Sequence, residues 1–364
     1  MSRVRRLLLA SLAALLALAS CGREKHETAA RTTEARKAAP ASSGPVSPTA
    51  ALDETIDALA GAEPRETLQD LATLRAGLEA AGDAAAADAI ARFLRSGRDA
   101  PTRLGFGVGP EGVLARPPTF RTALMNWLPA FDPDAALDMA RATIAAAESP
   151  EECALALRNI AWNDFEGDLH EELAAAFERV MTRPGWSENP TPGFLESLDI
   201  AVALGDREAF DQVGGMLATA EETGNDALLR AAFIALDRMV VRQPTLLAGN
   251  PDPLPPTQRA ALMSRLDPSD ASQRDILASY LGALRHPEET AEFTAQFPNA
   301  NQFQGNWLVT ASEETMSIRK LWERDRAILA ALDDLEHQVS GPGKQAVADL
   351  REKLAPMVSG PPPE

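Results

Sequence analysis

The sequence predicts an all-α fold in which short helices follow one another and pack as pairs. The composition supports this prediction: hydrophobic residues make up 45% of the chain, and aromatic residues only 5%. Small apolar residues, chiefly Ala and Leu, together with many Glu, Asp and Arg residues favour closely packed helices over strands. The second observation is a pattern of apolar stripes and capping residues, which is clearest in residues 132–164.

Residues 132–164 predict two helices joined by a tight turn. Asp132 and Ser149 can cap the two helices, and each is followed by a proline that fits the first helical position. The apolar stripes recur at spacings of three and four: Leu137, Ala140, Ile144 and Ala147 in the first helix, and Cys153, Leu157, Ile160 and Ala161 in the second. Because neither helix is stable alone in water, each must bury its stripe against neighbours, as in a stacked helical array.

Residues 1–20 are predicted to be a signal peptide. Three arginines precede an apolar run over residues 7–18, which is too short to span a bilayer. The run ends in Leu18-Ala19-Ser20-Cys21, which resembles the lipobox of bacterial lipoprotein precursors. That resemblance implies that Cys21 carries the lipid and becomes the mature N-terminus. It also implies a location in the cell envelope, anchored to a membrane, and Gly22 favours the outer one. An ordinary secretory signal with an accidental cysteine is the alternative.

Residues 21–50 are predicted to be a lipidated cysteine followed by a disordered tether, because Val46 is their only large aliphatic residue. The chain carries a net charge of −18; the leader contributes +3 and the tether +2, so residues 51–364 carry −23. So acidic a body is repelled by nucleic acid, which excludes phosphate-backbone binding. With Cys21 lipidated, Cys153 is the only other thiol, and we expect it to be buried.

Residues 51–340 are predicted to form the helical domain. Helices are expected over 52–60, 64–81 and 83–96, each with a glycine near its end. Near 102–116 the alternation of Leu104, Phe106 and Val108 before a Gly-Pro turn predicts a small β-hairpin or a packed extended loop.

Helix pairs are then expected to start near Thr119, Ser149, Pro192, Asn225 and Asp270. Their irregular intervals fall within the range of helical repeats. Over residues 119–300 the pattern resembles HEAT-type arrays, which implies an irregular right-handed α-solenoid and the role of a scaffold or binding surface.

Two loops are expected to interrupt the array, a proline-rich one over 243–256 and a polar one over 297–306. A longer helix is predicted over 313–339. Gly341-Pro342-Gly343 should break it and lead to a C-terminal helix and a Pro-rich tail within 341–364.

No metal, cofactor or catalytic residue is predicted. His170-Glu171 begins like a zinc-protease helix, but Ala174 replaces the second ligand. Residues 164–168 have the oxygen spacing of a calcium loop, but Leu169 and Ala175 stand where it needs a glycine and a bidentate acid.

The sequence therefore favours a membrane-anchored envelope lipoprotein that acts as a helical scaffold or as a protein- or peptide-binding module. An envelope hydrolase that uses paired carboxylates in a helical cleft is the alternative. The partner is expected to be a protein or peptide, and a basic one would fit because acidic residues on successive helices can add into one field. The candidate partner-binding residues are Glu166, Asp168, Glu171, Glu172, Trp186 and Trp307. The two tryptophans lie in loops and could make an exposed contact, or could fill gaps between repeats.

Overall fold

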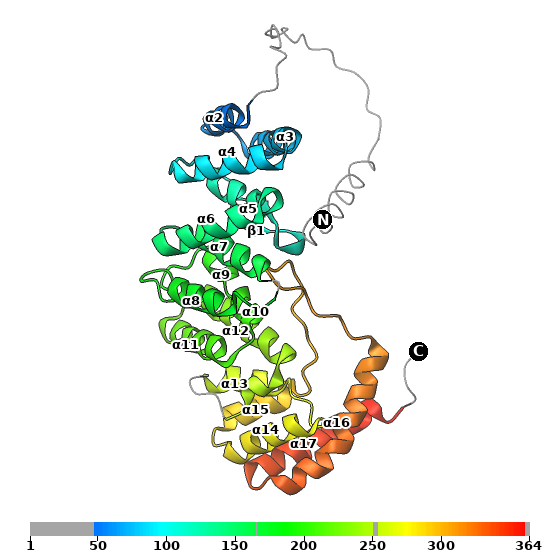
Figure 1. The fold of residues 1–364 in the computed structure, drawn as a ribbon. Coiled ribbons are helices and arrows are strands. Elements are labelled where there is room, and N and C mark those ends of the chain that lie inside the picture. Colours follow the sequence, from blue (N-terminus) through cyan, green and yellow to red (C-terminus); the bar gives the residue numbers. More distant parts are fainter. Residues whose placement is uncertain (1–46, 165, 250–253, 361–364) are drawn as a thin grey trace, which may run out of the picture. The chain divides into compact units, whose positions relative to one another are not determined.

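The structure, a computed structural model, describes residues 47–164, 166–249 and 254–360. Within these ranges nearly all regular structure is helical, so the predicted all-α class is confirmed (Figure 1). The predicted signal peptide, Cys21 and most of the tether lie outside the described residues. The contacts divide the chain into two compact units. The first contains the described residues up to Gly105 together with Pro117–Asp138, and the second contains Phe106–Arg116 and the described residues from Met139 onward.

The first unit confirms the three helices predicted near its start. Its helices are α2 (Pro48–Leu59), α3 (Pro64–Ala81), α4 (Asp83–Arg95) and α5 (Phe120–Phe131), and α6 (Pro133–Ala146) extends from it into the second unit. Ser47 caps α2, which therefore begins inside the range assigned to the tether. The ring of Phe93 meets that of Phe120 edge-on, with their centroids 5.1 Å apart, and this contact joins α4 to α5.

The segment near 102–116 contains the predicted β-hairpin. Strand β1 (Gly107–Val108) pairs antiparallel with β2 (Leu114–Arg116), and a 3₁₀ turn, η1 (Pro110–Gly112), connects them. The hairpin belongs to the second unit.

Helices of the second unit begin close to the predicted positions because capping residues precede them. The side chains of Ser149, Thr191, Asn225 and Asp270 each accept a hydrogen bond from the first turn of the helix that follows. The elements from α7 to α15 are α7 (Pro150–Asn163), α8 (His170–Met181), α9 (Pro192–Glu196), α10 (Asp199–Leu204), α11 (Arg207–Thr223), α12 (Asp226–Arg242), η2 (Pro244–Leu247), α13 (Pro256–Met263), α14 (Ala271–Ala283) and α15 (Pro287–Gln296).

The partners of these helices differ from a simple succession of pairs. Helix α12 packs most extensively against α11, which precedes it, and α13 packs against α15. The helix starts are set by local capping residues, whereas the pairing of the helices is set by which apolar faces meet. The sequence could therefore locate the helix starts but not the pairs. The solenoid arrangement and its right-handedness remain predictions.

The C-terminal part is α16 (Ile318–Gln338) and α17 (Pro342–Val358). Helix α16 begins five residues later than the predicted start at 313, because the chain is still extended at Glu313, where that side chain binds Arg242. Helix α17 packs against α14, α15 and α16. A Cβ on Gly343 would lie 2.5 Å from the carbonyl oxygen of Leu281, so only glycine allows this approach to α14.

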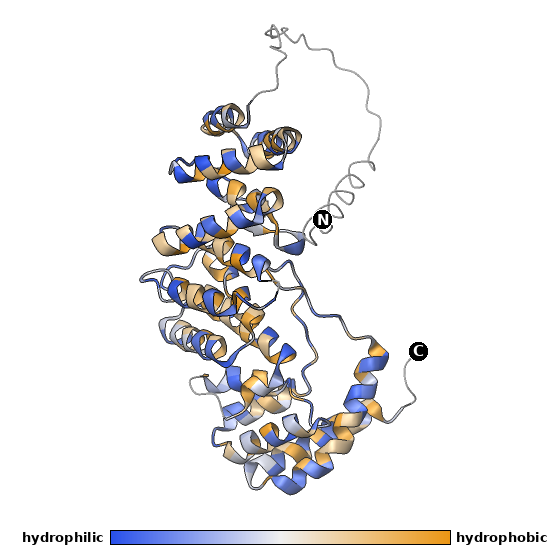
Figure 2. Cartoon of the chain, viewed as in Figure 1, coloured by the Kyte–Doolittle hydropathy of each residue, from blue (hydrophilic) through white to orange (hydrophobic). Residues whose placement is uncertain are grey.

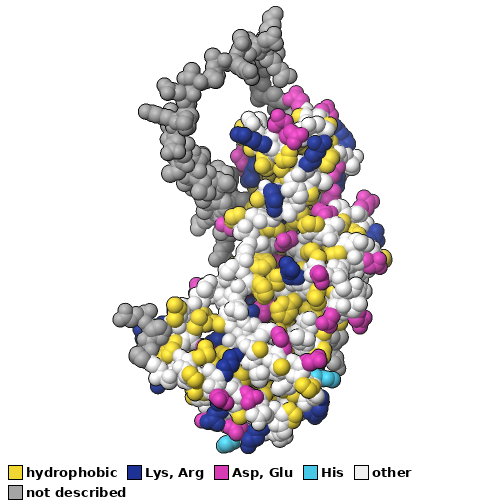
Figure 3. Space-filling model, turned by 180° about the vertical axis from the view of Figure 1, so that it is seen from behind, with side chains coloured by type: hydrophobic (Ala, Val, Ile, Leu, Met, Phe, Trp, Pro, Cys, Tyr) yellow, Lys and Arg dark blue, Asp and Glu magenta, His cyan; other side chains and the backbone are white. Residues whose placement is uncertain are grey.

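Most helices carry hydrophobic residues on one side and hydrophilic residues on the other (Figure 2). Cys153 is fully buried, which confirms the prediction for this thiol, and burial raises its pKa to about 12. Hydrophobic, acidic and basic side chains are interspersed on the face shown in Figure 3. Among the described residues, no helix combines the length and the apolar character that crossing a membrane requires.

Candidate functional site

The four acidic candidates lie around the start of α8, and one of them is paired with a basic side chain of α6. Glu166 and Asp168 are exposed in the turn before the helix, and Glu171 and Glu172 occupy its first turn. Glu172 is bound by Arg141, whose two guanidinium nitrogens each lie 2.8 Å from a carboxylate oxygen. Hydrogen bonding from Arg141 lowers the pKa of Glu172. One of the four is therefore already neutralised by α6.

The two tryptophan candidates have different surroundings. Trp186 is half-buried in the turn after α8 and meets the ring of Phe194 edge-on, with centroids 6.3 Å apart. Trp307 is half-buried in the segment between α15 and α16, residues 297–317, which we call the strap. The strap was predicted as a polar loop over 297–306, but it continues without regular structure to Ser317.

The strap runs from α15 past α12 to the hairpin and returns to α16 (Figure 1). Its backbone is fixed by basic side chains. Arg265, Arg242 and Lys353 donate hydrogen bonds to strap carbonyl oxygens. At its tip Leu308 is fully buried, and its carbonyl oxygen lies where a Cβ on Gly112 would stand, at 2.1 Å. The strap is thus an ordered part of the second unit.

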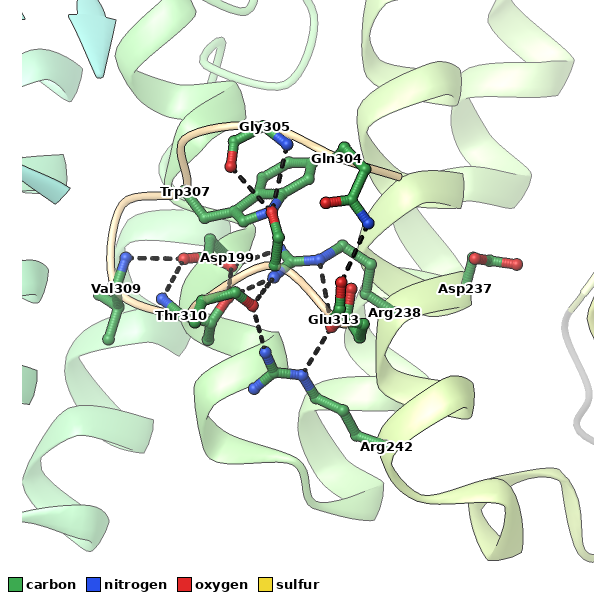
Figure 4. Close-up of polar contacts among 12 residues, drawn as sticks. Asp199, Asp237, Arg238, Arg242, Gln304, Gly305, Trp307, Val309, Thr310 and Glu313 are labelled. Atoms are coloured by element: carbon green, nitrogen blue, oxygen red, sulfur yellow. Dashed lines mark hydrogen bonds and ion pairs between the residues drawn. The ribbon is translucent and has the colours of Figure 1, made fainter. Parts of the chain in front are cut away.

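Arg238 is the centre of a buried polar cluster, the arginine hub, formed with Asp199, Trp307, Thr310 and Glu313 (Figure 4). Its side chain is 1% exposed, and its Nη1 donates to Asp199 Oδ1 at 2.6 Å. Its Nη2 donates to the Thr310 hydroxyl and, at 3.3 Å, to the carbonyl oxygen of Ala311. The indole of Trp307 covers the guanidinium, with 3.8 Å between the guanidinium carbon and the ring centroid. The hub ties α12 to the strap.

Asp199 joins α10 to the same hub. Its Oδ2 accepts the backbone N–H groups of Val309 and Thr310, at 2.7 and 2.9 Å, and its Oδ1 accepts the Thr310 hydroxyl at 2.6 Å as well as Arg238. All acceptor positions of this carboxylate are therefore in use. A buried charge with this many partners is satisfied and holds its neighbours in one geometry.

A second buried arginine holds the hairpin. Arg158 of α7 is fully buried; its Nη1 donates to the carbonyl oxygen of Gly112 at 2.8 Å, and its guanidinium stacks on Trp162 at 4.1 Å. Burial lowers the pKa of Arg158 to about 9, which still leaves the group charged at neutral pH. On the other side of α12, away from the hub, Asp237 forms a buried bidentate pair with Arg265.

A pocket of about 500 Å³, which we call the α12 pocket, opens beside the hub. Its lining comes from α9, α10, the part of α12 between Asp226 and Arg238, and Trp307. Much of the lining is apolar: Leu195, Leu198, Val202, Ala227, Ala231, Ile234 and Ala235. The polar lining residues outside the hub are Glu196, Asp226 and Arg230. Burial raises the pKa of Glu196 to about 7; the charge of Asp199 raises it further and Arg238 opposes the shift.

A second pocket of about 500 Å³ lies along the same helix and shares Asp226 and Arg230 with the first. It is lined by Phe233 together with polar residues of α13 and α15, among them Glu292 and Gln296. The exposed first turns of α12 thus separate two hollows. The α12 pocket is the better candidate site because it combines an apolar lining with a rigid polar wall.

Within the described ranges, no group of three or more His, Cys, Asp and Glu side chains is placed to hold a metal ion. Comparison with known proteins found no matching family, curated protein or solved structure.

Sequence reasoning missed Glu196, Asp199, Arg158 and Arg238, although some signals were present. Arg238 follows Asp237 inside the apolar run 234–241, where a charged pair requires buried partners. Arg158 lies on an apolar helix four residues before Trp162, the spacing at which a guanidinium can stack on an indole. Of the predicted residues, only Trp307 belongs to the candidate site.

Proposed function

We propose that the protein is a lipid-anchored protein of the bacterial envelope whose helical body binds a protein or peptide partner in the α12 pocket. The anchor is inferred from the lipobox-like Leu18-Ala19-Ser20-Cys21 and the apolar leader before it. The binding role is inferred from one observation above all: the α12 pocket has an apolar floor, a polar rim and a wall fixed by a buried ion pair.

A rigid wall favours binding because little conformational entropy is lost when a partner enters. Asp199 holds α10 against the strap, and Arg238 holds α12 against the same residues. The pocket residues contributed by these elements are therefore positioned before a ligand arrives. A peptide side chain or a short helix matches a hollow of this size, whereas the acidic surface disfavours polyanions.

A hydrolase is the second candidate, and Glu196 is the observation that favours it. A pKa of about 7 suits a general acid, and Asp199 lies close enough to raise it. Acid–base hydrolysis needs a second carboxylate that can accept a proton or attack. Asp199 cannot serve because its oxygens already accept four hydrogen bonds, and Asp226 is exposed at the rim. A binding role needs no second carboxylate and is therefore the simpler explanation of the pocket.

Photo-crosslinking in living cells tests the binding role. The photoreactive amino acid p-benzoylphenylalanine would replace Ala227, which is exposed at the pocket rim, in the full-length lipidated protein. Ala330, an exposed alanine of α16 that does not line the pocket, provides the matched control. We expect a discrete cross-linked product at Ala227 that is absent at Ala330. The same products at both positions, or none at Ala227, would contradict the proposal.

A further inference from the structure

Glu196 is the chemically distinctive group of the α12 pocket. Its side chain is half-buried and makes no hydrogen bond or ion pair with the described residues, whereas its neighbour Asp199 has four hydrogen bonds. The adjoining lining residues Leu195 and Leu198 offer it no hydrogen-bond donor. A half-buried carboxyl group without a donor loses part of its hydration, and this desolvation raises the pKa of Glu196.

The charges that face Glu196 across the pocket come from two elements, α10 and α12. Asp199 on α10 and Arg238 on α12 neutralise one another within the hub, as their 2.6 Å contact shows. Asp226 and Arg230 at the start of α12 are exposed to water, where their fields are screened. Among the described lining residues, Glu196 is therefore a half-buried carboxyl group whose side chain has no hydrogen-bond or ion-pair partner.

Three kinds of ligand group can be compared at this position. An anionic group would place a second negative charge beside the Glu196 carboxyl. An apolar group would fill the volume but leave the Glu196 carboxyl without a donor. A cationic group on an aliphatic stem matches both the apolar lining and the Glu196 carboxyl group. The stem covers the apolar lining while the charged head binds the carboxylate.

We propose that the α12 pocket receives a lysine or arginine side chain of an extended peptide segment, with its charged head on Glu196 and its stem against Leu198 and Ile234. This inference rests on the proposed binding function and specifies the chemistry of the partner. Glu196 is then the residue that selects the ligand, while Asp199 and Arg238 keep the walls of the pocket in place.

Binding of a cation changes the protonation of Glu196. At pH 7 a carboxyl group with a pKa of about 7 is half protonated, and a bound cation favours the ionised form. Up to about half a proton per ligand is therefore released on binding at this pH. An apolar ligand would release none, because it favours the neutral form.

Isothermal titration calorimetry of the full-length lipidated protein in detergent tests the inference. The probes are amidated pentapeptides of alanine and leucine whose central residue is lysine, arginine, norleucine or acetyl-lysine. We expect the cationic peptides to bind roughly tenfold to hundredfold more tightly than the norleucine peptide, the range of one charge-assisted hydrogen bond. Titrations of the cationic peptides at pH 7 should also give different heats in phosphate and in Tris, because the buffer takes up the released protons.

The Glu196→Gln variant should remove both the preference for cationic peptides and the proton release. Glu314→Gln, which changes an exposed glutamate of the strap, should alter neither. A melting curve for each variant confirms that it is folded. A norleucine peptide that binds as well as the lysine peptide, an unchanged preference in Glu196→Gln, or no binding of the lysine peptide at millimolar concentration would each overturn the inference.

Two further outcomes separate this inference from the proposed function. If a cross-link forms at Ala227 but the lysine peptide binds no more tightly than the norleucine peptide, the proposed binding function stands and its cationic ligand is rejected. Tighter binding of n-butylammonium than of the lysine peptide would replace the peptide by a free amine and so reject the occupant proposed above.

Discussion

Replacing Arg238 by methionine probes the arginine hub most directly, because methionine keeps much of the stem and removes the charge. The guanidinium is 1% exposed and donates to Asp199, Thr310 and Ala311. Removing one partner of a buried ion pair typically costs about 3–5 kcal/mol, because the other charge stays buried without its counter-ion. Asp199 keeps three neutral donors, which places the expected loss near the lower end, at about 3 kcal/mol.

Urea unfolding followed by circular dichroism measures this loss. Arg319→Met is the matched control because Arg319 pairs with Glu323 on the surface, with side chains 65% and 54% exposed. Its cost should be below about 0.5 kcal/mol. Introducing Arg238→Met into an Asp199→Asn background should cost less than in the wild type, since no buried charge is then left behind. If Arg238→Met costs no more than Arg319→Met, the hub does not stabilise the fold and the reasoning is wrong.

Three other predictions follow from the strap, the pocket and the leader. Gly112→Ala should cost about 1–3 kcal/mol more in urea unfolding than Gly185→Ala; both glycines have φ near +80°, but only at Gly112 does the new Cβ meet a backbone oxygen, that of Leu308. Equal losses would contradict close docking of the strap. The contribution of Glu196 to the stability of the wild type should fall by about 3 kcal/mol as the pH rises from about 4.5 to above 7, because the unfolded chain ionises Glu196 before the folded one does. Glu196→Gln should lack this decline in pH-dependent unfolding, and a decline of the same size in the variant would assign it to other groups. Labelled fatty acid should enter the wild type and not Cys21→Ser, whereas a variant that stays membrane-bound with its leader attached would reject the lipoprotein assignment.

The helix boundaries could be predicted because their signals are local. Ser149 and Asn225 cap the turns that follow them, and Pro342 occupies the first position of α17. The start of α16 was wrong by five residues because Glu313 is held in the strap by Arg242, which lies 71 residues earlier in the sequence. Local propensity carries no information on such a distant partner.

The candidate site could be predicted only in part for the same reason. Asp199 meets Arg238 and Thr310 across separations of 39 and 111 residues. Trp307 was selected because it lies in a polar loop, but the loop position alone could not indicate that an arginine covers its ring. The raised pKa of Glu196 depends on burial between α9, α10 and α12, which exists only in the folded chain.

A crystal structure of the protein with the lysine pentapeptide bound tests the central claim most directly. The lysine side chain should enter the α12 pocket, with its ammonium within hydrogen-bond distance of a Glu196 carboxylate oxygen. Its stem should run along Leu198 and Ile234, with the Arg238–Asp199 pair unchanged at its 2.6 Å separation. A peptide bound elsewhere with the pocket empty, or a norleucine peptide seated equally well in the same place, would contradict it.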